Sequence, residues 1–200
     1  TLFPYTTLFR SHMLILGIDP GYATVGYGLV QHERGKFTHI RHGAITTQPH
    51  VPMHLRLKEI HEDMLTLLDT FHPDAVSVEE LFFNTNITTG IQVAHARGVI
   101  LLACAERGIT PAEYTPSQVK QSVVGYGRAE KRQVMEMTKT MLHLQRMPRP
   151  DDAADALALA ICHAHTEGSQ LVRQRLQKST NFLTEILQEM LKKSVTTLHP

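Results

Sequence analysis

Several acidic residues stand where a buried element begins or ends. Asp19 closes the apolar run of residues 14–19, Glu79 and Glu80 close a second short run, and three acids fall within residues 151–155 at the start of an apolar stretch. Carboxylates brought together repel one another, and divalent cations offset that repulsion. Mg²⁺ prefers such hard oxygen ligands, and two ions can activate a water and stabilise the leaving oxygen in phosphodiester cleavage.

The spacing of these acids leaves two choices open. Successive strand residues point to opposite faces, so either Glu79 or Glu80 can face a common site. Both Asp151 and Asp152 are spaced to share a helix face with Asp155. Asp151 is the better candidate for a helix cap. Each acid alone is explained by a turn, a strand end or a cap, and only their combination indicates a metal site.

Charge is distributed unevenly along a chain whose formal net charge is only +1. Lys and Arg number 7 against 11 Asp and Glu in residues 13–115, but 7 against 2 in residues 116–150. Residues 151–165 hold three acids and no Lys or Arg. A basic block beside an acidic cluster suits a protein that binds phosphates and cuts one with metals, although a solvated basic surface explains the charge equally well.

Hydrophobic periodicity predicts the elements that must position these residues. Strands are expected over residues 14–19, 24–31, 36–46, 75–78 and 109–114. Helices are expected over residues 54–71, 88–107, 130–144 and 151–165, with a loop or short helical turn over 116–127. The first three strands have short connections and should form an antiparallel meander. The order predicts an α/β fold with a mixed five-stranded sheet flanked by helices.

Length and composition favour one main domain over residues 13–166. Residues 1–12 have no periodicity and resemble a translated sequencing adaptor, so we interpret them as a non-native leader. Residues 167–200 are expected to form a polar, partly helical tail. The two cysteines, Cys104 and Cys162, lie in apolar stretches, which indicates buried free thiols and a cytoplasmic location. No apolar run approaches 18 residues, which argues against a membrane partner.

Five motifs follow one another along the chain: ILGIDPGYATVGYGLV, SVEELFF, QVAHARGV, TPSQVKQSVVGYGRAEKRQV and DDAADALALAICHAH. Together, and in this order, they resemble the motifs of the RuvC family of Holliday-junction resolvases. The first is similar to the family's first hairpin, the second to its strand-end glutamate with a following aromatic residue, and the other three to its later motifs. The resemblance covers about residues 13–165 and implies a ribonuclease-H-like fold and metal-dependent endonuclease activity on four-way DNA junctions, in recombination and repair.

The resemblance also implies roles for individual residues. It selects Asp19, Glu79, Asp152 and Asp155 as ligands of two Mg²⁺ ions, with Mn²⁺ as a possible substitute. Lys120 and Lys131 are implied to contact DNA near the cut and to support catalysis. Arg128 and Arg132 are implied as further DNA contacts, and Phe82 as an aromatic residue that stacks on a base at the junction centre. His163 and His165 lie too far along the helix from Asp155 to join the metal site, and we interpret them as structural.

The family resemblance further implies a homodimer, which would present two sites for two symmetric cuts, and a possible RuvA–RuvB branch-migration partner. Two other classes share part of the pattern. One is a resolvase-like nuclease of the same fold that processes RNA, and the other is a single-domain relative of the actin and Hsp70 ATPases. The block QVKQSVVGYG argues against the first, and the lack of a second phosphate loop against the second.

Overall fold

The computed structural model describes residues 12–81 and 87–169, together with residues 177 and 184. The chain divides into one unit over Thr1–Ala164 and a second over His165–Pro200. The first unit contains all the strands and helices that position the candidate site. In the second unit, residues 165–169 are helical, and the Ser169 hydroxyl donates a 2.8 Å hydrogen bond to the carbonyl oxygen of His165.

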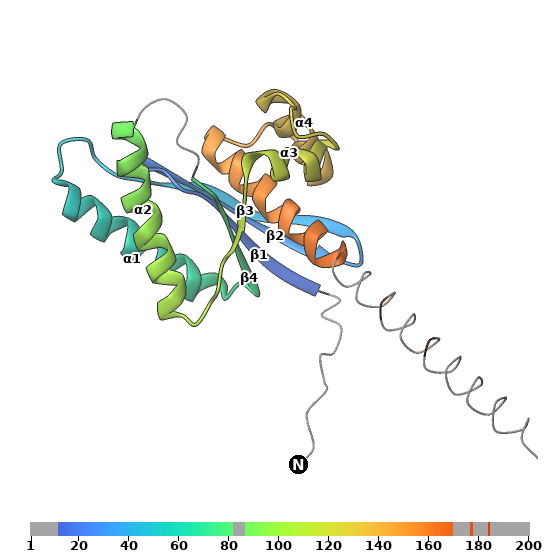
Figure 1. Cartoon of the computed structure of the whole chain (residues 1–200), viewed down its shortest axis with the longest axis horizontal. Coiled ribbons are helices and arrows are strands. Elements are labelled where there is room, and N and C mark those ends of the chain that lie inside the picture. The colour runs from blue at the N-terminus through green and yellow to red at the C-terminus, as the bar shows by residue number, and fades with distance from the viewer. Residues whose placement is uncertain (1–11, 82–86, 170–176, 178–183, 185–200) are drawn as a thin grey trace, which may run out of the picture. The chain divides into compact units, whose positions relative to one another are not determined.

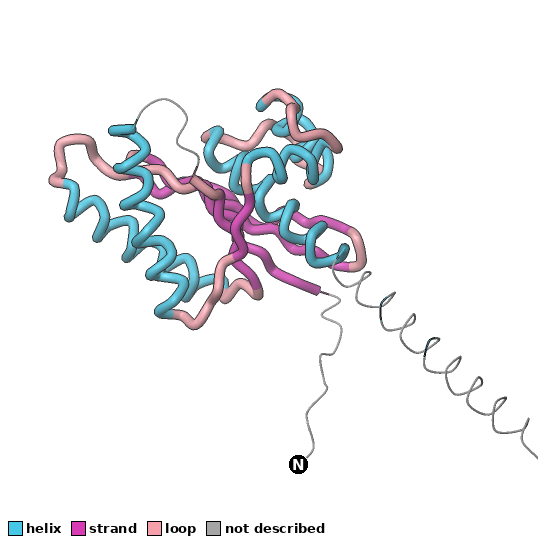
Figure 2. The backbone as a smooth tube through the Cα atoms, viewed as in Figure 1, coloured by secondary structure: helices cyan, strands magenta, loops and turns pink. Residues whose placement is uncertain are grey.

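A five-stranded sheet forms the centre of the first unit (Figures 1 and 2). Its strands are β1 (His12–Asp19), β2 (Thr24–Glu33), β3 (Lys36–Thr46), β4 (Ala75–Glu79) and β5 (Ala112–Tyr114), in the spatial order β3-β2-β1-β4-β5. The first three strands pair antiparallel, whereas β4 pairs parallel with both β1 and β5. The predicted meander and the predicted mixed five-stranded sheet are therefore confirmed.

Helices cover both faces of this sheet (Figure 1). On one face lie α1 (Met53–Phe71) and α2 (Ile87–Glu106), and their apolar side chains form one buried core with Leu16, Ile18 and Val76. On the other face lie α3 (Pro116–Val124), α4 (Lys131–Met141) and the helical residues 151–164, which form a second core around Ile15. The sheet thus separates two apolar layers, as the alternation of the strands requires.

Two predictions about local structure are corrected. Residues 116–124 form a regular helix, not a loop or single turn, because Thr115 and Gln118 make a capping box around a proline at the first turn. The strand predicted over 109–114 is confined to residues 112–114, where it pairs with β4. Within the described part of the chain, no helix is both long and apolar enough to cross a membrane.

Candidate metal-dependent catalytic site

Two of the acids lie at the carboxyl ends of neighbouring parallel strands. Asp19 ends β1 and Glu79 ends β4, and the residues before them, Ile18 and Val78, are paired in register. Side chains alternate along both strands, so Asp19 lies on the same face as Gly17, and Glu79 on the same face as Ala75. Gly17 and Ala75 both pack on the helical residues 151–164 or their core. Glu79 therefore faces Asp19, and Glu80 points to the opposite face.

The other two acids are brought to this edge by close packing of a helix on the sheet. Gly26 is paired with Asp19, and a Cβ atom added at Gly26 would overlap the backbone oxygen of Asp152. A Cβ at Gly17 would likewise overlap the backbone oxygen of Ala156. These glycines allow the helix backbone to lie directly on the strands, which places Asp152 and Asp155 beside Asp19.

Asp151 is positioned differently from what its place in the sequence predicts. It is already the first helical residue, so it does not precede the helix as a cap. Its carboxylate instead accepts a 2.6 Å ion-pair hydrogen bond from Arg149. The backbone amide of Ala153 donates to the carbonyl oxygen of Pro150, which provides one backbone hydrogen bond in the first turn. Asp151 therefore has an arginine partner of its own, which none of the four acids shares.

The electrostatics of the four acids show mutual repulsion in a poorly solvated place. Burial, followed by the charges of Glu79, Asp155 and Asp152, raises the pKa of Asp19 to about 8. Burial and the charge of Asp155 raise the pKa of Glu79 to about 7. Burial also raises the pKa of Asp155, and this effect outweighs the hydrogen bond from Lys131 that lowers it. A divalent cation at this edge would offset these repulsions.

Lys131 and Lys120 supply positive charge at the same place. The Nζ atom of Lys131 lies 2.7 Å from the Asp155 carboxylate. Burial lowers the pKa of Lys131, but its hydrogen bond to Asp155 and the neighbouring carboxylates raise it more. Lys120 reaches the site from α3, and the two lysines line a cavity of about 200 Å³ together with Glu79 and Asp155. Two ammonium groups and two carboxylates therefore line the same cavity.

Four carboxylates are chemically suitable ligands for a divalent metal, but their side chains are too far apart to coordinate one ion together. Within residues 12–81 and 87–169, no three carboxylate, imidazole or thiol side chains stand close enough to enclose an ion. The Asp155 carboxylate is meanwhile engaged by Lys131. Metal binding therefore requires the carboxylates to turn toward one another. Their role as ligands stays a prediction.

The remaining predicted contacts are more dispersed. Arg128 is exposed in the connection between α3 and α4, and Arg132 is exposed on α4, where it pairs with Glu136 at 2.9 Å. Phe82 lies outside the described residues. His163 is structural as interpreted, because it is buried and its Nδ1 atom lies 2.8 Å from the Tyr114 hydroxyl. Both cysteines are buried free thiols, as expected.

Sequence reasoning missed two arginines that support the site. Arg97 of α2 donates from Nε to the carbonyl oxygen of Glu79 at 3.2 Å and pairs with Glu113, so it fixes the end of β4. Arg56 of α1 is buried, donates to the carbonyl oxygen of Tyr22 at 3.2 Å and lies 3.7 Å from the centre of that ring. It thereby secures the turn after Asp19. Arg97 could have been found from the sequence, because it is a charged residue within an otherwise largely apolar helix.

The raised pKa values predict how stability depends on pH. In the folded state, the pKa values of Asp19 and Glu79 lie above their ordinary values of 3.8 and 4.5, so both carboxyls bind a proton more tightly there than in the unfolded chain. The folded protein therefore holds more protons than the unfolded chain between about pH 4 and pH 8, and its stability falls as pH rises through that window. We expect the melting temperature in EDTA to decline from about pH 5 to pH 8. Mg²⁺ should raise it more at the higher pH, because binding displaces protons.

A calorimetric series across this range, with and without chelator, tests that expectation. Asp19→Asn provides the control, because asparagine has no proton to gain and should remove a large part of the decline. A melting temperature that is independent of pH in EDTA would show that these carboxyls titrate normally.

Comparisons with known proteins agree with this arrangement. A family model described as Crossover junction endodeoxyribonuclease RuvC matches residues 15–163. The protein of that name from Alkaliphilus metalliredigens is 56% identical over 154 residues, which are 77% of this chain and 94% of that protein. Its counterpart from Clostridioides difficile is 53% identical over 154 residues, 77% of this chain and 91% of that protein.

Solved structures show the same fold. The structure of Thermus thermophilus RuvC in complex with Holliday junction substrate has a TM-score of 0.74 and 38% identity, and the match covers 78% of this chain and 94% of that one. The yeast mitochondrial Holliday junction resolvase Ydc2 has a TM-score of 0.58 at 15% identity, covering 83% and 85% of the two chains, which supports the fold alone. The expected ribonuclease-H-like fold is thereby confirmed.

Proposed function

The chain belongs to the RuvC family of crossover junction endodeoxyribonucleases, and from this premise we propose that it resolves four-way DNA junctions by paired symmetric nicks. The matched region includes all four acids and both site lysines. The two bacterial relatives named above are matched over more than nine tenths of their length. One solved relative is described in complex with a Holliday junction substrate.

The observation that carries this proposal is that four carboxylates lie near the carboxyl ends of β1 and β4. We propose that Asp19, Glu79, Asp152 and Asp155 hold two Mg²⁺ ions, with Mn²⁺ as a substitute. Family nucleases are metal-dependent. When bound, such ions activate a water and stabilise the leaving oxygen of the phosphodiester. The raised pKa of Asp19 supports a cation here, because a bound divalent ion would replace the proton that this buried carboxyl retains.

The two lysines would act on the phosphate. Lys120 and Lys131 line one cavity with Glu79 and Asp155, so an ammonium can contact a phosphate oxygen placed there. Lys131 would exchange its Asp155 partner for that oxygen, which frees the carboxylate. Val119 and Val134 form apolar walls of the cavity, and such a low-dielectric surrounding would strengthen these charge interactions.

The remaining proposals concern the assembly. Phe82, Arg128 and Arg132 are proposed to contact DNA, with Phe82 at the junction centre. A homodimer would present two sites to the two strands cut in a junction. Ile91 and Leu102 support it, because both lie on α2 with about half of their side-chain surface exposed, 49% and 50%. We also propose that the protein is cytoplasmic and that it acts together with a RuvA–RuvB branch-migration complex.

A synthetic mobile four-way junction tests the proposed function directly. With Mg²⁺ we expect two symmetrically placed nicks that appear together, because a two-fold dimer presents two equivalent sites. Linear duplex DNA of the same sequence is the substrate control, and structured RNA tests the RNA-processing alternative. Cleavage of the duplex or the RNA as fast as the junction would contradict the assignment.

A further inference from the structure

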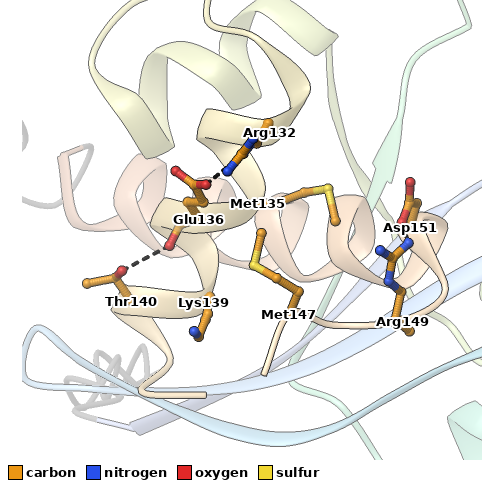
Figure 3. Close-up of a pocket in the computed structure, with 8 residues that line it drawn as sticks. All are labelled: Arg132, Met135, Glu136, Lys139, Thr140, Met147, Arg149 and Asp151. Atoms are coloured by element: carbon orange, nitrogen blue, oxygen red, sulfur yellow. Dashed lines mark hydrogen bonds and ion pairs between the residues drawn. The ribbon is translucent and has the colours of Figure 1, made fainter. Parts of the chain in front are cut away.

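A second cavity is lined by residues of α4 that differ from those lining the cavity of the candidate site. It has a volume of about 580 Å³ and is open to solvent. Its lining residues come from α4, the connection that follows it and the start of the helix over residues 151–164; they are Arg132, Met135, Glu136, Lys139, Thr140, Met147, Arg149 and Asp151 (Figure 3). We refer to this cavity as the α4 cleft.

The α4 cleft and the candidate site are lined by neighbouring residues on two elements. On α4, Arg132 of the cleft directly follows Lys131 of the site. At the helix start, Asp151 of the cleft directly precedes Asp152. A strand bound at the site would pass close to the α4 cleft.

The cations of the α4 cleft are available to an anion. Lys139 has no ion-pair partner among the residues that the structure describes. Arg149 and Arg132 are bound to Asp151 and Glu136, but these are exposed pairs, and such pairs are weak enough to open for a phosphate. Met135 and Met147 lie between the charged groups and give the cleft an apolar surface (Figure 3).

From this arrangement we propose that the α4 cleft is a second phosphate-binding position, in which Lys139 and Arg149 contact the backbone of the DNA strand next to the scissile phosphate. The inference rests on the proposed function, because it extends the path of the same substrate. Arg149 can form two parallel hydrogen bonds with a phosphate, and Lys139 adds a point charge. Neither contact reads a base, so the α4 cleft would add affinity without sequence preference.

The salt dependence of junction binding tests this proposal. Binding of a synthetic four-way junction is measured in EDTA, so that no cleavage occurs, at several KCl concentrations. Each lost phosphate contact lowers the slope of log K against log salt by about 0.9. Because a homodimer presents two α4 clefts to one junction, Lys139→Gln and Arg149→Gln should each remove two contacts and reduce that slope by about 1.8. Between about 50 and 200 mM salt, the affinity of each variant should therefore fall about 12-fold less than the affinity of the unmodified protein falls.

Lys58→Gln is the matched control, because Lys58 is an exposed lysine of α1 on the opposite face of the sheet. It removes the same charge and should leave the slope unchanged. The proposal is overturned if Lys139→Gln and Arg149→Gln keep the unmodified slope, or if Lys58→Gln lowers it equally. An unmodified protein that nicks junctions in Mg²⁺ but shows either result retains the proposed function and loses only this inference. Absence of nicking by the unmodified protein defeats the proposed function instead.

Discussion

Replacing Asp19 with asparagine should abolish metal-dependent junction cleavage and leave junction binding nearly unchanged. Asp19 is the most buried of the perturbed acids, and its carboxyl is the one most strongly raised in pKa, to about 8. Asparagine keeps the shape but removes the negative charge that would hold a cation. Loss of outer-shell partners of metal ligands already costs about 10- to 100-fold, so loss of a ligand should lower cleavage by at least about 100-fold.

Two measurements separate this explanation from a folding defect. Junction affinity in EDTA should stay close to that of the unmodified protein, since Lys120, Lys131 and the α4 cleft are intact. The melting temperature in EDTA at about pH 8 should rise, because a buried carboxyl no longer needs to lose its proton. Glu80→Gln is the matched control, because Glu80 faces away from Asp19. Wild-type cleavage by Asp19→Asn, or a loss of cleavage in Glu80→Gln of the same size, would show that the metal site is wrongly assigned.

The sequence alone predicts where the acids lie along the strands, because apolar runs that end in an acid are a local pattern. It does not choose between Glu79 and Glu80, since alternation gives opposite faces without saying which face the catalytic helix covers. That choice follows from a long-range contact, the packing of Ala75 and Gly17 toward the helical residues 151–164. The family resemblance made the same selection of Glu79.

Other features depended on contacts that no local pattern encodes. The ion pair between Lys131 and Asp155 joins α4 to a helix that begins 20 residues later, and Arg97 reaches Glu79 from α2. Contacts of this kind can be predicted only when the fold is already known. The helix α3 is a different case, because its capping box is present in the sequence as Thr115-Pro116-Ser117-Gln118. Two glycines nearby, Gly125 and Gly127, suggested a loop, yet Gly125 ends the helix in a left-handed conformation with φ of 96°.

A single methyl group at Gly17 should destabilise the whole domain. The added Cβ would overlap the backbone oxygen of Ala156 and lie 2.9 Å from the backbone nitrogen of Ala160. Backbone atoms within a helix cannot move aside as a flexible side chain can, so the helix must lift from β1 as a unit. Overpacking of this kind costs about 3 kcal/mol. For a domain of this size, that loss should lower the melting temperature by about 6–12 °C.

Gly98→Ala is the matched control for Gly17→Ala. Gly98 lies in α2 with no described atom within 4 Å of an added Cβ, so alanine fits there and should stabilise the helix by about 0.5–1 kcal/mol. Unfolding is followed at several protein concentrations, which separates any effect of Gly98 on self-association from its effect on folding. Gly17→Ala should also cleave junctions more slowly at a temperature where it is fully folded, because the same helix carries Asp152 and Asp155. Equal melting temperatures for the two variants would mean that the helix does not pack on β1 at Gly17. The packing at Gly17 would then not explain how Asp152 and Asp155 are placed beside Asp19.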